Sequence, residues 1–151
     1  GEGHGTHFAG EAYQRIELSE NGLDCRVVPA SDPVGEGTYS AAEFMPALIR
    51  DGEKLENQDW TGEQPRACFG AGDQGIYMLV IEGRYPDEGI RGTSVNTCSD
   101  ILLAYGCRNA LNMDGGSSAI LWYDGEYVTQ SSSSFLRYTG GRPLPNAWVY
   151  G

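Results

Sequence analysis

Three pairs of residues that favour tight turns divide this sequence, and they constrain its fold more than any other feature. Asn21-Gly22, Asp51-Gly52 and Asp124-Gly125 each stand between two short runs of apolar or alternating residues. Asn-Gly and Asp-Gly supply the positive φ angles that two-residue β-hairpin turns require. Each pair therefore predicts an antiparallel hairpin. The 22 glycines of the chain agree with a fold of many turns and short elements.

The rest of the chain reads as further strands and one helix. Strands are predicted over 13–18, 23–28, 46–50, 53–55, 65–72, 76–82, 107–113, 119–123, 126–129 and 147–150, and residues 40–45 form either a turn of helix or a strand. The apolar run 76–82 predicts a central strand that is covered on both faces. Ser94 can cap a helix over about 95–105, and Gly106 fits the left-handed position that ends it. The fold class is therefore α+β, with a twisted, mostly antiparallel mixed sheet, several hairpins and one main helix.

Length and charge limit what the chain can be. A chain of 151 residues can bury about 70 % of its unfolded surface as one domain, and no repeat or linker divides it, so we expect a single domain over 1–151. The net charge of −11 argues against nucleic acid or an anionic membrane as the general partner. It leaves room for an anionic substrate, because a few arginines can make a local positive pocket. No apolar run reaches 18 residues and the first residues are polar, so the sequence predicts no membrane span and no signal peptide in this chain.

The four cysteines offer no metal site of a familiar kind. Cys25, Cys68, Cys98 and Cys107 form no CxxC pair, so zinc is not expected. Cys98 and Cys107 bracket the predicted helix, at about 13 Å, which is too far for a disulfide. A Cys25–Cys68 disulfide remains open, and buried free thiols are at least as plausible for all four.

The stretch 109–123 is the best place to look for chemistry. Asp114 lies between an apolar run and four small residues, Gly115, Gly116, Ser117 and Ser118. Glycines let the backbone turn tightly, and successive amide N–H groups and hydroxyls can hold an anion. Asp114 is therefore a candidate general acid or base, metal ligand or turn former.

Other charged residues near strand ends could complete such a site. Arg66, Arg84 and Arg142 suit bidentate contact with phosphate or carboxylate, although surface ion pairs would explain each of them equally well. Glu82 ends the most apolar strand, where partial desolvation favours the protonated form and a general-acid role. With Asp114 it could form the carboxylate pair that glycoside cleavage uses. The alternative for Glu82 is an ion pair with Arg84.

Two further features have more than one interpretation. Trp60, in the polar loop 56–64, either packs over the core, which we favour, or forms a platform for substrate. The segment 4–10, with His4 and His7, and the segment 92–94 look like the histidine and serine motifs of subtilisin-like proteases. No aspartate motif precedes the histidines, and the residues after Ser94 do not continue the serine motif, so a protease is a remote alternative.

The chain resembles the phosphodiester glycosidase family over about residues 46–151. The matching blocks occur in the family's order and spacing at 46–52, 66–70, 81–84, 93–105, 110–118 and 141–147. The most specific are Asn112-Met113-Asp114-Gly115-Gly116 and Arg142-Pro143 followed by Asn146-Ala147. The family's upstream block is missing and residues 30–45 stand as a short loop in its place, which predicts a domain shortened in its N-terminal part.

This resemblance implies a glycosidase-type hydrolase that cleaves a sugar-1-phosphodiester, with a phosphorylated glycan or sugar phosphate as substrate. It implies catalytic roles for Asp114 and Glu82, the latter standing where we expect Asp, and substrate-binding roles for Arg66, Arg84, Asn112, Gly115, Gly116, Ser117, Ser118, Arg142 and Asn146. No cofactor is certain, and a divalent cation, calcium or magnesium, is a candidate. An extracellular or cell-surface location is implied as well. The alternative is a non-catalytic carbohydrate- or phosphate-binding module of the same fold.

Overall fold

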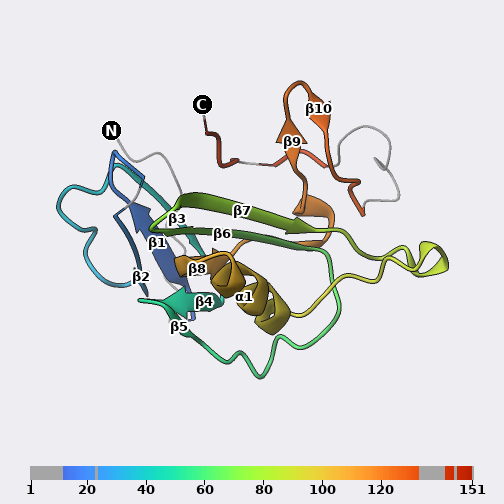
Figure 1. Ribbon diagram of the computed structural model, residues 1–151, viewed down its shortest axis with the longest axis horizontal. Helices are drawn as coiled ribbons and strands as arrows, with labels where there is room; N and C mark the ends of the chain where they lie inside the picture. The colour runs from blue at the N-terminus through green and yellow to red at the C-terminus, as the bar shows by residue number, and fades with distance from the viewer. Residues whose placement is uncertain (1–11, 23, 133–141, 145, 151) are drawn as a thin grey trace.

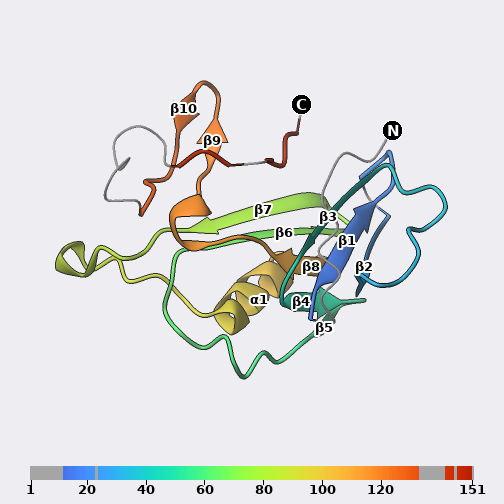
Figure 2. The same cartoon turned by 180° about the vertical axis from the view of Figure 1, so that it is seen from behind.

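The computed structural model describes residues 12–22, 24–132, 142–144 and 146–150, and its larger elements form three layers (Figure 1). A five-stranded sheet is the middle layer. The helix α1 (Val95–Ala104) packs on one face of this sheet, and a three-stranded sheet packs on the other. Figure 2 shows the same arrangement from behind. The fold is α+β, as predicted.

Every strand pair of the described residues is antiparallel. The three-stranded sheet has the order β2-β1-β3, with β1 (Gln14–Leu18), β2 (Cys25–Pro29) and β3 (Ser40–Phe44). The five-stranded sheet has the order β5-β4-β8-β6-β7, with β4 (Ala47–Arg50), β5 (Glu53–Lys54), β6 (Arg66–Gly72), β7 (Gly75–Ile81) and β8 (Cys107–Asn112). The remaining elements are the hairpin of β9 (Trp122–Tyr123) and β10 (Glu126–Tyr127) and the short 3₁₀ helices η1 (Pro86–Glu88) and η2 (Gly116–Ser118).

All three predicted hairpin turns are present. Asn21-Gly22 joins β1 to β2, Asp51-Gly52 joins β4 to β5, and Asp124-Gly125 joins β9 to β10. The glycine of each pair has a positive φ, between 72° and 88°. Residues 40–44, for which helix and strand were both open, form β3 and pair with β1.

The prediction for the apolar run 76–82 is half right. Its strand, β7, is an edge strand that pairs only with β6, and β8 occupies the centre of the sheet. Both faces of β7 nevertheless contact apolar clusters. Tyr77, Leu79 and Ile81 pack toward α1, whereas the alternate residues Ile76 and Met78 pack toward the three-stranded sheet. Coverage on two faces requires apolar residues at every position, whether or not the strand is central.

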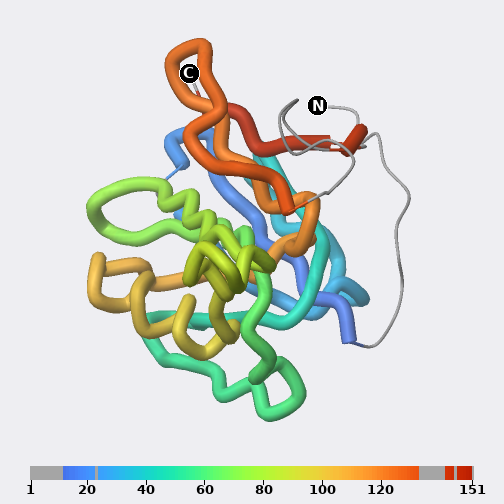
Figure 3. The backbone as a smooth tube through the Cα atoms, turned by 90° about the vertical axis from the view of Figure 1, so that its right-hand side faces the viewer, coloured from blue at the N-terminus to red at the C-terminus, as the bar shows by residue number. Residues whose placement is uncertain are grey.

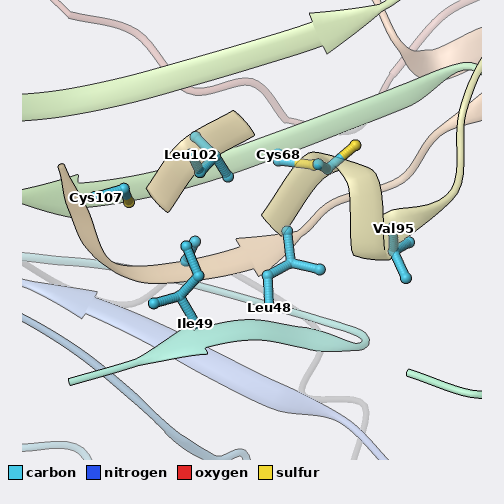
Figure 4. Close-up of a cluster of buried hydrophobic side chains, with 8 residues drawn as sticks. Leu48, Ile49, Cys68, Val95, Leu102 and Cys107 are labelled. Carbon is cyan, nitrogen blue, oxygen red and sulfur yellow. The ribbon is translucent and has the colours of Figure 1, made fainter. Parts of the chain in front are cut away.

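The helix begins and ends close to its predicted limits. The Ser94 side chain accepts a hydrogen bond from the Thr97 N–H at 3.2 Å, which caps the helix, and Gly106 follows it with a φ of 86°. The buried residues Val95, Cys98, Ser99 and Leu102 repeat with helical spacing and face the sheet. Figure 4 shows the cluster between the helix and β4, β6 and β8.

Three predicted strands are shorter or absent. Of residues 126–129, only Glu126 and Tyr127 lie in a strand. Of residues 119–123, only Trp122 and Tyr123 lie in a strand. Residues 146–150 form no strand, because Trp148 stacks flat on Phe69 of β6 instead of extending a sheet. Their ring centroids are 3.8 Å apart and the planes differ by 5°. A sheet face and a sheet edge both accept residues of high β-propensity, so propensity alone predicted the wrong contact.

The four cysteines are free thiols. The possible Cys25–Cys68 disulfide does not form, since Cys68 faces the α1 side of the central sheet and Cys25 packs on the opposite side. Burial raises the pKa of Cys25 to about 12 and that of Cys107 to about 11. Trp60 packs at the margin of the α1 cluster, as favoured. Among the described residues, no helix is both long and apolar enough to cross a membrane.

Candidate functional site

Three predicted site residues meet at the surface beside η2. The guanidinium of Arg142 lies 2.6 Å from Asp114 Oδ2, and its Nε and Nη2 donate to Ser118 Oγ at 3.0 and 2.6 Å. The Ser118 hydroxyl in turn donates to Asp114 Oδ2 at 2.6 Å. We call these three residues the acid–arginine cluster. Its charged members are about half exposed, at 53 % for Asp114 and 48 % for Arg142, so a ligand can reach them from solvent.

The end of β8 fixes where the cluster stands. Asn112, the last residue of β8, is fully buried, and its side-chain amide donates to the Met45 carbonyl at 2.7 Å. The backbone N–H of Asn112 donates to the Pro46 carbonyl, and that of Met113 donates to the Ala67 carbonyl. Asn112 therefore holds the start of the site loop against its neighbours, and its amide nitrogen is already used.

The two glycines of the loop permit close backbone contacts. A Cβ on Gly115 would lie 2.6 Å from the Pro65 carbonyl oxygen, which is too close for any side chain. Gly116 has a φ of 57°, and a Cβ there would lie 3.0 Å from Nη1 of Arg84. The sequence alone could not show that these glycines bring Arg84 to the loop.

Arg84 is held in an uncommon backbone conformation. Its φ is 68°, which is rare outside glycine and often marks functional positions. Its Nε donates to Gln64 Oε1 at 2.9 Å. Arg84 is exposed, and its guanidinium lies next to Gly116. Gly116 is two residues from both Asp114 and Ser118 of the acid–arginine cluster.

Arg66 reaches in a different direction from Arg84. Its buried guanidinium donates to the carbonyls of Thr93 and Gly62 at 3.0 and 2.8 Å and lies 5.8 Å from the ring centroid of Trp60. Burial lowers the pKa of Arg66. These contacts show how Arg66 fastens the loop before β6. A role in binding substrate stays a prediction.

Glu82 holds the hairpin that follows η2. Its Oε1 accepts a hydrogen bond from the Gln130 N–H at 2.5 Å. No hydrogen bond or ion pair of the described residues joins Glu82 to Asp114 or to Arg84, so neither the carboxylate pair nor the alternative ion pair is seen. The catalytic role of Glu82 remains a prediction without a contact to support it.

Two of the remaining predicted residues, Ser117 and Asn146, take no part in the hydrogen bonds that the structure describes for the acid–arginine cluster. Ser117 accepts a hydrogen bond at its carbonyl from Ser131, while Asn146 is exposed and makes no hydrogen bond to the cluster among the described residues. The expectation of a run of free amides is met only in part, because the N–H groups of Gly116, Ser118 and Ala119 donate to backbone carbonyls. Ser94 caps α1, and both histidines of the protease alternative lie outside the described residues.

The predicted site lies at the surface, where Asp114 and Arg142 are about half exposed. Two cavities, of about 390 and 250 Å3, lie among the described residues, and neither is lined by a predicted site residue. The same part of the chain has no group of three His, Cys, Asp or Glu side chains placed to hold a metal ion. A divalent cation stays a prediction, because magnesium is usually held by only one or two carboxylates together with water and substrate phosphate.

Sequence reasoning missed two residues whose hydrogen bonds hold the site residues in position. Gln64 orients Arg84, and Ser131 binds the carbonyl of Ser117 and accepts the Tyr85 hydroxyl at its own carbonyl. Gln64 precedes the matched Arg66 block, which is a weak signal. For Ser131, within a run of serines, we find no signal.

Comparisons with known proteins give the family and the fold. The family model of phosphodiester glycosidases matches residues 4–150, which extends the resemblance well upstream of residue 46. No curated protein sequence matches this chain. Among solved structures, the zebrafish N-acetylglucosamine-1-phosphodiester alpha-N-acetylglucosaminidase catalytic domain, auto-inhibited by its pro-peptide, is similar with a TM-score of 0.59 and 15 % identity.

That likeness covers 84 % of this chain and 47 % of the zebrafish chain, so this chain spans about half the length of the protein it matches. At this identity it shows the fold alone. A hypothetical protein from Synechocystis matches more weakly, with a TM-score of 0.48, 19 % identity, and coverage of 81 % of this chain and 32 % of its own.

Proposed function

Because this chain belongs to the phosphodiester glycosidase family, we propose that it hydrolyses a sugar-1-phosphodiester and releases the sugar from a phosphate that stays on another group. The substrate is a phosphorylated glycan or a sugar phosphate. An extracellular or cell-surface location belongs to the same proposal, and the family resemblance is its support.

The acid–arginine cluster is the observation that carries this proposal. A phosphodiester presents anionic oxygens, and the planar guanidinium of Arg142 can bind two of them at once. Arg84 brings a second guanidinium to the same loop. In a chain with a net charge of −11, Arg142 beside the Asp114 carboxylate and Arg84 next to Gly116 form a local site suited to an anion next to a sugar.

The contacts suggest how each residue of the cluster acts. The phosphate replaces Asp114 as the partner of Arg142, which frees the carboxylate beside the sugar–phosphate bond. Asp114 then acts on that bond as acid–base or as nucleophile, while the Ser118 hydroxyl, 2.6 Å away, keeps it oriented. Water completes the reaction by taking the place of the phosphate on the sugar.

A chromogenic sugar-1-phosphodiester, with N-acetylglucosamine as the first sugar tried, tests the proposal. We expect Asp114→Asn to lower kcat at least about a hundredfold, since positioned acid–base groups contribute that much or more. Asp51→Asn is the matched control, because Asp51 is also followed by glycine but lies in the β4–β5 turn. Equal activity of the Asp114→Asn variant and the wild type would refute the role of Asp114.

One observation favours the alternative, a module that binds carbohydrate or phosphate without turnover. The described residues show one carboxylate in the cluster, whereas glycoside cleavage usually uses two, and Glu82 is engaged with Gln130. Calorimetric binding of the same diester without product formation would identify the module. Each assay is run with calcium, with magnesium and with EDTA, and turnover that survives EDTA removes the divalent cation from the proposal.

A further inference from the structure

The β9–β10 hairpin exposes aromatic rings directly after the candidate site. Trp122 is 60 % exposed, Tyr123 72 % and Tyr127 56 %. Figures 1 and 2 show the hairpin standing clear of the two larger sheets, above η2 and the end of β7. Trp122 is four positions after Ser118, so their Cα atoms are at most about 14 Å apart. The rings are within the reach of a ligand bound at the acid–arginine cluster.

The register of the hairpin gives its two faces different chemistry. Trp122 pairs with Tyr127, and Tyr123 pairs with Glu126. Directly opposed residues of an antiparallel pair project from the same face. One face therefore carries two adjacent aromatic rings, and the other carries one ring beside a carboxylate.

Hydrogen bonds at its base fix the hairpin to the site. The Gln130 N–H donates to Glu82, and the Ser131 hydroxyl donates to the carbonyl of Ser117 within η2. The Tyr85 hydroxyl donates to the Ser131 carbonyl. Rings on an anchored hairpin lose little freedom when a ligand binds, which favours binding.

Charge decides which part of a substrate faces the hairpin. Arg142 and Arg84 lie at its base, whereas Asp124 and Glu126 lie at its tip. A phosphate is attracted to the base and repelled by the tip. The part of the ligand over the rings is therefore uncharged.

We propose that Trp122 and Tyr127 form a platform on which a saccharide ring of the substrate stacks, next to the phosphate held by Arg142. The apolar face of a pyranose contacts the aromatic rings, and its hydroxyls remain in solvent. This inference rests on the proposed function for the nature of the ligand. It adds a specificity determinant that lies outside the cluster.

The test measures binding of uncharged sugars to the intact chain, without any turnover. The probes are N,N′-diacetylchitobiose, cellobiose and maltose, each titrated by calorimetry and by NMR. We expect at least one to bind the wild type, and Trp122→Ala and Tyr127→Ala each to weaken it about threefold to tenfold, as expected for one aromatic contact. Tyr123→Ala, on the other face, is the matched control and should bind like the wild type.

The outcomes separate this inference from the proposed function. Sugar binding that depends on Trp122 and Tyr127 supports the platform even if no diester is cleaved. Failure of all three sugars to bind, or an equal loss in Tyr123→Ala, overturns the platform even if diesters are cleaved. Sedimentation of the same variants is also measured, and a change from dimer to monomer with unchanged sugar binding would identify an interface between copies and overturn the proposal.

Discussion

Two charged residues of this protein, Asp114 and Glu17, carry their charge in opposite settings. Asp114 is half exposed and pairs with a half-exposed Arg142, so the pair contributes little to folding stability and can exchange partners with a ligand. Glu17 on β1 is buried, and its two oxygens accept hydrogen bonds from Arg15 and Arg26 at 2.6 and 2.7 Å. The first setting suits binding, and the second suits stability.

The stability of the protein should therefore fall in acid through Glu17. Burial by itself raises the pKa of Glu17, but hydrogen bonds from Arg15, Arg26, Thr38 and the Gly35 N–H outweigh it and lower the pKa from 4.5 to about 2. A carboxyl whose pKa is lower in the folded state stabilises the fold above its unfolded pKa. We expect this contribution, roughly 3 kcal/mol, to be lost between about pH 4.5 and pH 2.

Urea unfolding of the wild type and of Glu17→Gln, at pH 7 and at pH 2.5, measures this effect. The variant is expected to be less stable at pH 7, because it leaves Arg15 without its buried partner. The gap in free energy of unfolding between the two proteins should narrow in acid. A gap that stays constant with pH would contradict the assignment to Glu17.

The sequence predicts the residue types of the candidate site better than their directions. Asp114 and Ser118 lie close together, because a loop between a strand and a 3₁₀ helix leaves few directions for short side chains, whereas Arg142 reaches them from 24 residues further along the chain. Arg66 and Arg84 are long and have several rotatable bonds, so the carbonyls that capture Arg66 could not be foreseen. The same applies to Glu82, whose partner is a backbone N–H 48 residues later in the chain.

At the scale of elements, local signals were enough wherever a turn or a cap decides the structure. The three hairpins follow from their Asx-Gly pairs, and α1 follows from Ser94 and Gly106. The order of the strands does not follow, because any apolar strand can occupy an edge when its two faces are covered. The apolar residues 147–150 predict a strand, but Trp148 packs on a sheet face. Residue propensity does not distinguish packing on a sheet face from pairing at a sheet edge.

Removal of the helix cap should destabilise α1. Ser94→Ala leaves the Thr97 N–H without its acceptor, and we expect a loss of about 1 kcal/mol in the free energy of unfolding. Ser94→Asp keeps an acceptor at this position and should retain most of the stability. Chemical denaturation followed by circular dichroism measures both variants, and equal stability of Ser94→Ala and the wild type would contradict the capping role.

At the scale of the whole molecule, side chains join the two large sheets. Arg50 on β4 donates to the Val27 carbonyl and to Gln14, and Asn109 on β8 donates to the Cys25 carbonyl. The C-terminal segment also packs here, since Trp148 stacks on Phe69 and contacts the apolar cluster between the two sheets. Figure 3 shows this segment returning toward the hairpin and the N-terminal strands.

The Trp148 stack should position Arg142, which lies six residues earlier. We expect Trp148→Ala to lower the free energy of unfolding by about 2 kcal/mol and to weaken inorganic phosphate binding, although Trp148 does not touch the cluster. Thermal denaturation and calorimetry measure the two effects. Trp148→Phe keeps the stacked ring and loses a buried N–H that has no partner among the described residues, so it should be as stable as the wild type. Phosphate binding unchanged in Trp148→Ala would contradict this link.

The Asp114–Arg142 ion pair also sets an order in time. Asp114 and Ser118 leave the ribosome well before Arg142, so the Asp114–Arg142 ion pair forms only after the chain has been synthesised past Arg142. The segment around Arg142 thus completes the cluster that the loop after β8 begins. A nascent chain that has not reached Arg142 therefore carries the Asp114 carboxylate without its guanidinium partner.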